Sequence, residues 1–124
     1  MKPLLSLCLL ALLTACASAP STISDASGYE ASGEASYYAD KYQSRQTASG
    51  ERFDQAALTA AHRTLPFGTR VRVTHVENGK SVVVRINDRG PFTAGRIIDL
   101  SKRAFSRLAS THVGVIPVHI EVVD

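Results

Sequence analysis

The chain has 124 residues, of which 14 are lysine or arginine and 11 are aspartate or glutamate. This length fits a single domain, and a formal net charge of +3 is too weak to indicate nucleic-acid binding. Most of the basic residues are arginines, whose planar guanidinium groups suit carboxylates. A substrate with carboxyl groups is therefore one interpretation, and solvated strand faces are the other.

The N-terminal segment indicates export from the cytoplasm. Residues 4–13 are apolar, too short to span a bilayer, and followed by small residues, as in a signal peptide. The sequence Leu13-Thr14-Ala15-Cys16 resembles the lipobox of bacterial lipoproteins, which predicts that residues 1–15 are removed and that Cys16 carries the lipid anchor. Cys8 is then lost, so no disulfide framework remains. Because Ala17 and not aspartate follows the cysteine, the sorting rules of such lipoproteins favour the outer membrane, facing the periplasm.

Residues 17–32 are rich in serine, alanine, threonine and glycine, with Ile23 and Tyr29 as the only large apolar side chains. Such a segment buries too little surface to fold, which predicts a flexible tether. We therefore expect residues 16–32 to form the lipidated N-terminus and its tether, and residues 33–124 to form the folded domain.

Short strands and turns are predicted from residue 33 onward. The alternating segment 70–76, the Asn78-Gly79 turn and the β-branched segment 81–87 predict an antiparallel hairpin. Residues 101–109 predict one short helix with Ser101 as its N-cap. The expected strands are 33–39, 58–62, 70–76, 81–87, 96–100 and 113–123. Six strands and one helix without a repeat favour a mainly β fold, a small closed barrel.

Asp88 is the first candidate functional residue, because a hydrophobic strand delivers it into the turn Asn87-Asp88-Arg89-Gly90-Pro91. Side chains at the end of a rigid strand are well placed to face a ligand. The alternative interpretation is structural: Asp88 caps the turn through a bond to the backbone and pairs with Arg89.

Several motifs occur together in order: 33–38, 47–53, 58–62, 65–69, 87–92 and 96–101. In these segments, which include Thr47-Ala48-Ser49-Gly50-Glu51 and Asn87-Asp88-Arg89-Gly90-Pro91-Phe92, the chain resembles the rare lipoprotein A family. The resemblance implies a six-stranded double-psi β-barrel and lytic transglycosylase activity on peptidoglycan. It also implies a preference for naked glycan strands that have lost their stem peptides.

The chain departs from the family in three respects. Many members carry a C-terminal glycan-binding domain that brings them to the division septum, whereas this chain ends at Asp124, so we expect no targeting by that route. Tyr37 stands where tryptophan is usual, and Ser49 where asparagine is common. Both residues keep an aromatic or small polar group, and we expect them to affect affinity at most.

A lytic transglycosylase cleaves the bond between N-acetylmuramic acid and N-acetylglucosamine while the muramyl 6-hydroxyl closes on the anomeric carbon to give a 1,6-anhydro end. This requires an acid, a base and stabilisation of an oxocarbenium-like state. The resemblance gives Asp88 as acid and base, Glu51 as second carboxylate and His62 as the residue that orients one of them or binds the sugar. Their structural alternatives are a solvated turn residue for Glu51 and a core histidine for His62. Asp99 is a rival carboxylate, or else a helix-cap residue.

Candidate substrate-binding residues surround this set. Tyr37, Tyr38 and Phe92 are expected to stack on sugars, with Arg89 and Asp99 beside them. Among the aromatic residues, Phe53, Phe67 and Phe105 are expected in the core. The remaining histidines, His75, His112 and His119, show no metal-ligand spacing, so we expect no metal and no cofactor.

Three classes of function remain open. The first is a peptidoglycan lytic transglycosylase anchored to the outer membrane. The second is an expansin-like lipoprotein that binds glycan without turnover. The third is a lipid-tethered adaptor for cell-division proteins. Fold analogy alone does not decide between them.

Overall fold

The computed structural model describes residues 26–123, so the predicted signal peptide, Cys16 and most of the predicted tether lie outside the described residues. Six strands, one α-helix and two single-turn 3-10 helices make up this part of the chain. The strands are β1 (Glu30–Tyr37), β2 (Thr59–Ala61), β3 (Arg70–His75), β4 (Ser81–Asp88), β5 (Arg96–Leu100) and β6 (Ile116–Val122). The helices are η1 (Asp40–Tyr42), α1 (Lys102–Ser106) and η2 (Thr111–Val113).

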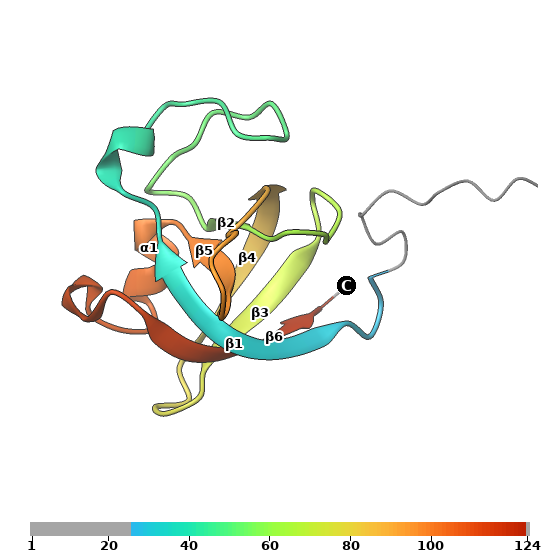
Figure 1. The fold of residues 1–124 in the computed structure, drawn as a ribbon, viewed down its shortest axis with the longest axis vertical. Coiled ribbons are helices and arrows are strands. Elements are labelled where there is room, and N and C mark those ends of the chain that lie inside the picture. The colour runs from blue at the N-terminus through green and yellow to red at the C-terminus, as the bar shows by residue number, and fades with distance from the viewer. Residues whose placement is uncertain (1–25, 124) are drawn as a thin grey trace, which may run out of the picture.

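The strands form a closed barrel in the order β1-β5-β2-β4-β3-β6 (Figure 1). Two of its pairs are parallel, β1 with β5 and β2 with β4, and the other four are antiparallel. The chain must therefore cross the barrel between β1 and β5 and between β2 and β4, and these crossings bring residues distant in sequence side by side. The prediction of a closed six-stranded barrel with one short helix is confirmed.

The core follows from the alternation of side chains along the strands. Val71 and Val73 of β3 and Val82, Val84 and Ile86 of β4 are buried, whereas the residues between them are exposed or half-buried. Helix α1 covers one part of the barrel with the fully buried side chains of Ala104 and Phe105. Ser101 is its N-cap, as predicted, because its Oγ accepts a hydrogen bond from the backbone N–H of Ala104 at 3.2 Å.

Several predicted boundaries are wrong. Strand β1 begins at Glu30 rather than at residue 33, so the last residues of the predicted tether belong to the barrel, where β6 pairs with them from Glu30 opposite Glu121. Backbone pairing supports this polar segment although few of its side chains are buried. Helix α1 ends at Ser106 rather than 109, and the last strand begins at Ile116 rather than 113. Within residues 26–123, no helix has the length and apolar character needed to cross a membrane.

Candidate active site

Two irregularities in strand pairing place the candidate site. Between β2 and β4, Ala60 pairs with Ile86 but Ala61 pairs with Asp88, so the register skips Asn87. Between β1 and β5, Glu34 pairs with Arg96 but Ala35 pairs with Ile98, so the register skips one residue again. An extra residue of this kind redirects the side chains that follow it.

As a result, four residues on neighbouring strands lie in one row. Asp99 of β5 pairs with Ser36 of β1 on one side and with Ala61 of β2 on the other, and Ala61 pairs in turn with Asp88 of β4. All four line a cleft of about 770 Å³. Because Asp88 and Asp99 both flank Ala61, their Cα atoms are about two strand spacings, or roughly 10 Å, apart. The barrel thus presents two carboxylates to one cleft.

Three donors surround the Asp88 carboxylate. Its Oδ1 accepts hydrogen bonds from the backbone N–H groups of Ala48 at 2.8 Å and Arg89 at 2.9 Å, and its Oδ2 accepts one from the Tyr38 hydroxyl at 2.6 Å. The bond to the Arg89 amide is the turn-capping contact of the structural alternative, so Asp88 caps the turn and also lines the cleft. All three bonds suit an ionised carboxylate, which only accepts.

Tyr38 is fixed on its other side by stacking on the buried Phe53, with ring centroids 4.2 Å apart. Burial, followed by the hydrogen bond to Asp88, raises the pKa of Tyr38 far above its ordinary value. The phenol therefore stays protonated and remains a hydrogen-bond donor to Asp88.

Asp99 is the second carboxylate of the cleft. Burial raises its pKa above the ordinary value, the Arg96 guanidinium 3.2 Å away opposes this, and the Asp88 carboxylate adds to the increase. The interpretation of Asp99 as a helix-cap residue is wrong, because Ser101 is the N-cap of α1 and Asp99 lies within β5. Asp99 is thus a carboxyl group biased toward its protonated form beside the donor-surrounded Asp88.

Glu51 does not line the cleft. Its carboxylate accepts from both terminal nitrogens of Arg85, at 2.6 and 3.0 Å, and from Asn87 Nδ2 at 3.1 Å. These contacts, the Arg85 hydrogen bond first, lower the pKa of Glu51. Adjacent residues of a strand point to opposite faces, so Asn87 faces Glu51 while Asp88 faces the cleft. Glu51 fixes the loop that contains Ala48, a donor to Asp88.

His62 is buried behind the cleft. Its Nδ1 accepts from the backbone N–H groups of Thr64 and Leu65, both at 3.1 Å, so its proton resides on Nε2, 3.3 Å from the Tyr29 hydroxyl. Burial, with smaller contributions from nearby arginines, lowers the pKa of His62 to about 4. The ring is therefore neutral near neutral pH. The backbone N–H of His62 donates to the Asp88 carbonyl at 3.1 Å, which ties the two residues through the main chain.

The predicted binding residues differ in how free they are to meet a ligand. Phe92 is 81% exposed at the edge of the cleft, whereas Tyr37 lines the cleft but packs on Phe105 and donates to the Thr111 carbonyl at 2.8 Å. The Arg89 guanidinium donates to the Leu65 carbonyl at 2.9 Å and lies 4.0 Å from the ring centre of Phe67. Phe67 is 43% exposed, so its expected place in the core is wrong, because it packs beneath this guanidinium.

The sequence analysis missed one wall of the cleft. Lys41 and Tyr42 of η1, and Arg45 just after it, line the cleft. A signal was present, since two basic residues flank an aromatic residue within an otherwise polar loop. Nothing local indicated that this loop lies next to Asp88.

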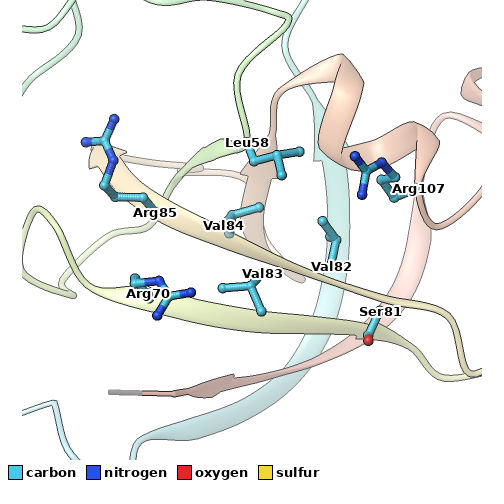
Figure 2. Close-up of a pocket in the computed structure, with 8 residues that line it drawn as sticks. All are labelled: Leu58, Arg70, Ser81, Val82, Val83, Val84, Arg85 and Arg107. Atoms are coloured by element: carbon cyan, nitrogen blue, oxygen red, sulfur yellow. The ribbon is translucent and has the colours of Figure 1, made fainter.

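A second hollow, here called the β4 groove, has a different character. Figure 2 shows its lining residues, with the Arg70, Arg85 and Arg107 guanidinium groups around valines of β4. Its volume is about 560 Å³, and its lining residues are Leu58, Arg70, Ser81, Val82, Val83, Val84, Arg85 and Arg107. None of these residues carries a carboxyl group or an imidazole, so the groove has no side chain suited to proton transfer near neutral pH. Elsewhere in residues 26–123, no three histidine, cysteine, aspartate or glutamate side chains are grouped so as to bind a metal ion.

Taken together, the closed barrel with two parallel crossings and the carboxylate-containing cleft define a double-psi β-barrel protein. The model of a protein family described as "Lytic transglycolase" matches residues 30–120. The chain belongs to this family, that of rare lipoprotein A, which confirms the resemblance seen in the motifs.

Curated relatives agree with this assignment. The chain is 60% identical over 92 residues to the "Probable endolytic peptidoglycan transglycosylase RlpA" of Synechocystis sp., covering 74% of this chain and 29% of the relative. It is 47% identical over 102 residues to the "Endolytic peptidoglycan transglycosylase RlpA" of Pseudomonas aeruginosa, covering 82% and 30%. The chain therefore spans less than a third of the length of these two relatives.

Solved structures share the fold. The Streptomyces papain inhibitor superposes with a TM-score of 0.63 at 26% identity, covering 77% of this chain and 96% of the inhibitor. An expansin of Clavibacter michiganensis superposes with a TM-score of 0.60 at 24% identity, covering 77% of this chain and 51% of the expansin. At 24% identity, the likeness to the expansin shows a shared fold alone.

Proposed function

We propose that this protein is a lytic transglycosylase that cleaves the bond between N-acetylmuramic acid and N-acetylglucosamine in peptidoglycan and leaves 1,6-anhydro ends. The observation that carries the proposal is the pair of carboxylates, Asp88 and Asp99, on either side of Ala61 in one open cleft. The names of the relatives supply the substrate class.

The environments of the two carboxyl groups divide the chemistry between them. Asp99, whose pKa is raised by burial, donates its proton to the glycosidic oxygen, and the N-acetylglucosamine leaves with a free 4-hydroxyl group. The muramyl 6-hydroxyl then forms its bond to the anomeric carbon and gives its proton to Asp88. Pairs of titratable groups in contrasting environments commonly divide acid and base roles in this way. The negative charge of Asp88 also stabilises the oxocarbenium-like transition state. This assignment moves the acid from Asp88, the residue favoured by sequence, to Asp99.

Glu51 and His62 act in this proposal as positioning residues. Glu51 holds the loop that brings the Ala48 amide to Asp88, and His62 holds the turn whose backbone bonds to the Asp88 carbonyl. The exposed ring of Phe92 at the edge of the cleft supplies a stacking surface for a sugar.

The proposal includes a location and a substrate preference. Lipid attachment at Cys16 anchors the barrel to the outer membrane, facing the periplasm, where it meets peptidoglycan and cell-division proteins. The enzyme prefers naked glycan strands. The support for these points is the lipobox-like sequence Leu13-Thr14-Ala15-Cys16 and the family membership.

A second candidate function is glycan binding without turnover. The likeness to a papain inhibitor, whose chain is almost entirely this barrel, supports only the absence of turnover, because a shared fold accommodates unrelated activities. In that case the cleft would bind glycan strands without cleaving them.

The experiment that separates these candidates is mass spectrometry of the soluble products released from purified sacculi, some stripped of stem peptides by an amidase. Wild-type protein should release anhydro-ended glycans, and Asp88→Asn should lower the rate by about 1,000-fold, within the range for loss of an acid–base group. The matched control is Asp54→Asn, an exposed residue outside the cleft, which should behave as wild type. Reducing-end products would identify a hydrolase, and binding to sacculi without products would favour the second candidate.

A further inference from the structure

The wall of the cleft formed by Lys41, Tyr42 and Arg45 has a charge that the reaction does not use. Lys41 Nζ lies 5.4 Å and Arg45 Cζ lies 5.7 Å from the ring centre of Tyr42. The Tyr42 ring meets the Tyr38 ring edge-on at 5.8 Å, and Tyr38 donates to Asp88. Two cations thus flank the Tyr42 ring, and Tyr38 links this ring to the Asp88 carboxylate.

These cations differ from the other basic residues of the cleft. Arg96 pairs with Asp99, and the Arg89 guanidinium is bound to backbone carbonyls. In contrast, neither Lys41 nor Arg45 forms an ion pair with any residue in the range 26–123. Their positive charge is therefore available to an anion that enters the cleft.

The loop that carries them is held in place by bonds at both ends. Lys102 Nζ contacts both carboxylate oxygens of Asp40, at 2.8 and 2.9 Å, and the Phe53 amide donates to the Arg45 carbonyl at 2.7 Å. Gln55 Nε2 donates to the Tyr38 carbonyl at 2.8 Å. Because the backbone of this loop is already fixed, binding a ligand orders only the Lys41 and Arg45 side chains and not the loop itself.

We infer that Lys41 and Arg45 bind the free lactyl carboxylate of N-acetylmuramic acid and thereby select naked glycan strands. The inference rests on the proposed function and deepens it. In a strand that still bears stem peptides, this carboxyl group is part of a neutral amide. When the peptide is removed, it becomes the anion that recurs along the glycan, next to N-acetyl and hydroxyl groups that carry no charge. A lysine and an arginine on one wall of the cleft match a single carboxylate, and the Tyr42 ring between them offers a surface for the sugar.

The test compares two substrates that differ only in this charge. Amidase-stripped glycan strands are used with the lactyl carboxylates free, or with the same groups converted to methylamides by carbodiimide coupling to methylamine. The wild-type protein should cleave the free-acid strands about three- to tenfold faster, as expected for exposed charge pairs. The double variant Lys41→Gln/Arg45→Gln should cleave both strands at the same, lower rate. Lys41→Arg/Arg45→Lys should restore most of the preference.

A matched control removes the same charges elsewhere. Lys80→Gln/Arg107→Gln also replaces one lysine and one arginine, in the β3–β4 turn and in the β4 groove, and should keep the wild-type preference. Equal rates of the wild-type protein on both strands would overturn the inference, as would a preference that survives in the Lys41/Arg45 variant.

Binding measurements keep the inference separate from the proposed activity. Asp88→Asn protein should bind the free-acid strands more tightly than the methylamide strands, and adding the two glutamine substitutions should abolish the difference. If the wild-type protein cleaves neither strand, the proposed activity fails, while this binding difference still supports the selection of the carboxylate. Equal binding of both strands by the Asp88→Asn protein would overturn it.

Discussion

The two hollows of this barrel are similar in size but differ in chemistry. The cleft, of about 770 Å³, contains Asp88 of β4 and Asp99 of β5, on the two strands that flank β2, whereas the β4 groove, of about 560 Å³, is lined by valines, arginines, one leucine and one serine. The cleft also has both a donor-surrounded carboxylate and a carboxyl group with a raised pKa. Size alone therefore does not identify the site. The environment of its titratable groups does.

Beyond Asp88, the largest effect is expected at Asp99. Replacing Asp99 by asparagine removes the proposed acid and should lower the rate by about 100-fold or more. In the wild-type protein the acid must be protonated, so activity should fall as the pH rises through the raised pKa of Asp99. The pH profile of kcat/KM for glycan cleavage measures this, and Asp99→Glu should keep part of the activity and the alkaline limb. An unchanged rate for Asp99→Asn would return the acid role to Asp88.

Asp99 also predicts an opposite effect on stability. A carboxyl group with a raised folded-state pKa loses stabilisation as the pH rises above its unfolded-state pKa. Near neutral pH the buried charge therefore costs stability, and Asp99→Asn should raise the Tm while it lowers activity. A lower Tm at neutral pH would mean that the contact with Arg96 outweighs the burial of the charge.

The next effect, on the free energy of unfolding, concerns the turn behind the cleft, where His62 is buried in its neutral form. Its pKa is lowered from 6.5 to about 4, so unfolding takes up a proton between these values, and stability should fall as the pH drops through this window. The full loss is about 3 kcal/mol. Urea denaturation at a series of pH values should show a steeper dependence for the wild-type protein than for His62→Gln. His112→Gln, at an exposed histidine, is the control, and equal slopes for all three proteins would contradict the prediction.

How much of this site the sequence could predict depends on how local each feature is. The hairpin formed by β3 and β4 follows from alternating side chains and the Asn78-Gly79 turn, and the helix start follows from Ser101. The position of Asp88 at a strand end is also a local property. These predictions hold because neighbouring residues determine them.

The placement of Asp88 and Asp99 on either side of Ala61 could not be predicted in the same way. It depends on two register shifts, one that skips Asn87 and one between Glu34 and Ala35, and a shift of one residue turns a side chain to the other face. Motif order placed Glu51, His62 and Asp88 in one set, but Glu51 bonds to Arg85 and the His62 ring is buried behind the cleft. Contacts between distant strands decide which of these side chains reach the cleft.

A smaller effect is expected when one donor to Asp88 is removed. Tyr38→Phe keeps the ring that stacks on Phe53 but loses the 2.6 Å hydrogen bond to Asp88. One hydrogen bond to a charged group corresponds to about a tenfold effect, and we expect it in kcat with little change in KM. Steady-state kinetics on stripped glycan strands measure the two constants. A change in KM alone would assign Tyr38 to substrate binding rather than to positioning Asp88.

The smallest effect is expected in the β4 groove, and it is the sharpest test of the comparison between the two hollows. Arg70→Gln/Arg107→Gln removes two guanidinium groups that line the groove and form no ion pair with any residue from 26 to 123. Surface substitutions of this kind change stability by no more than about 0.5 kcal/mol, and the cleavage rate should stay within about twofold of wild type because these side chains lie outside the cleft. Cleavage assays and thermal unfolding measure both quantities. A larger loss of activity with an unchanged Tm would show that the groove also contacts the glycan, and the site would then extend from the strand ends along β4.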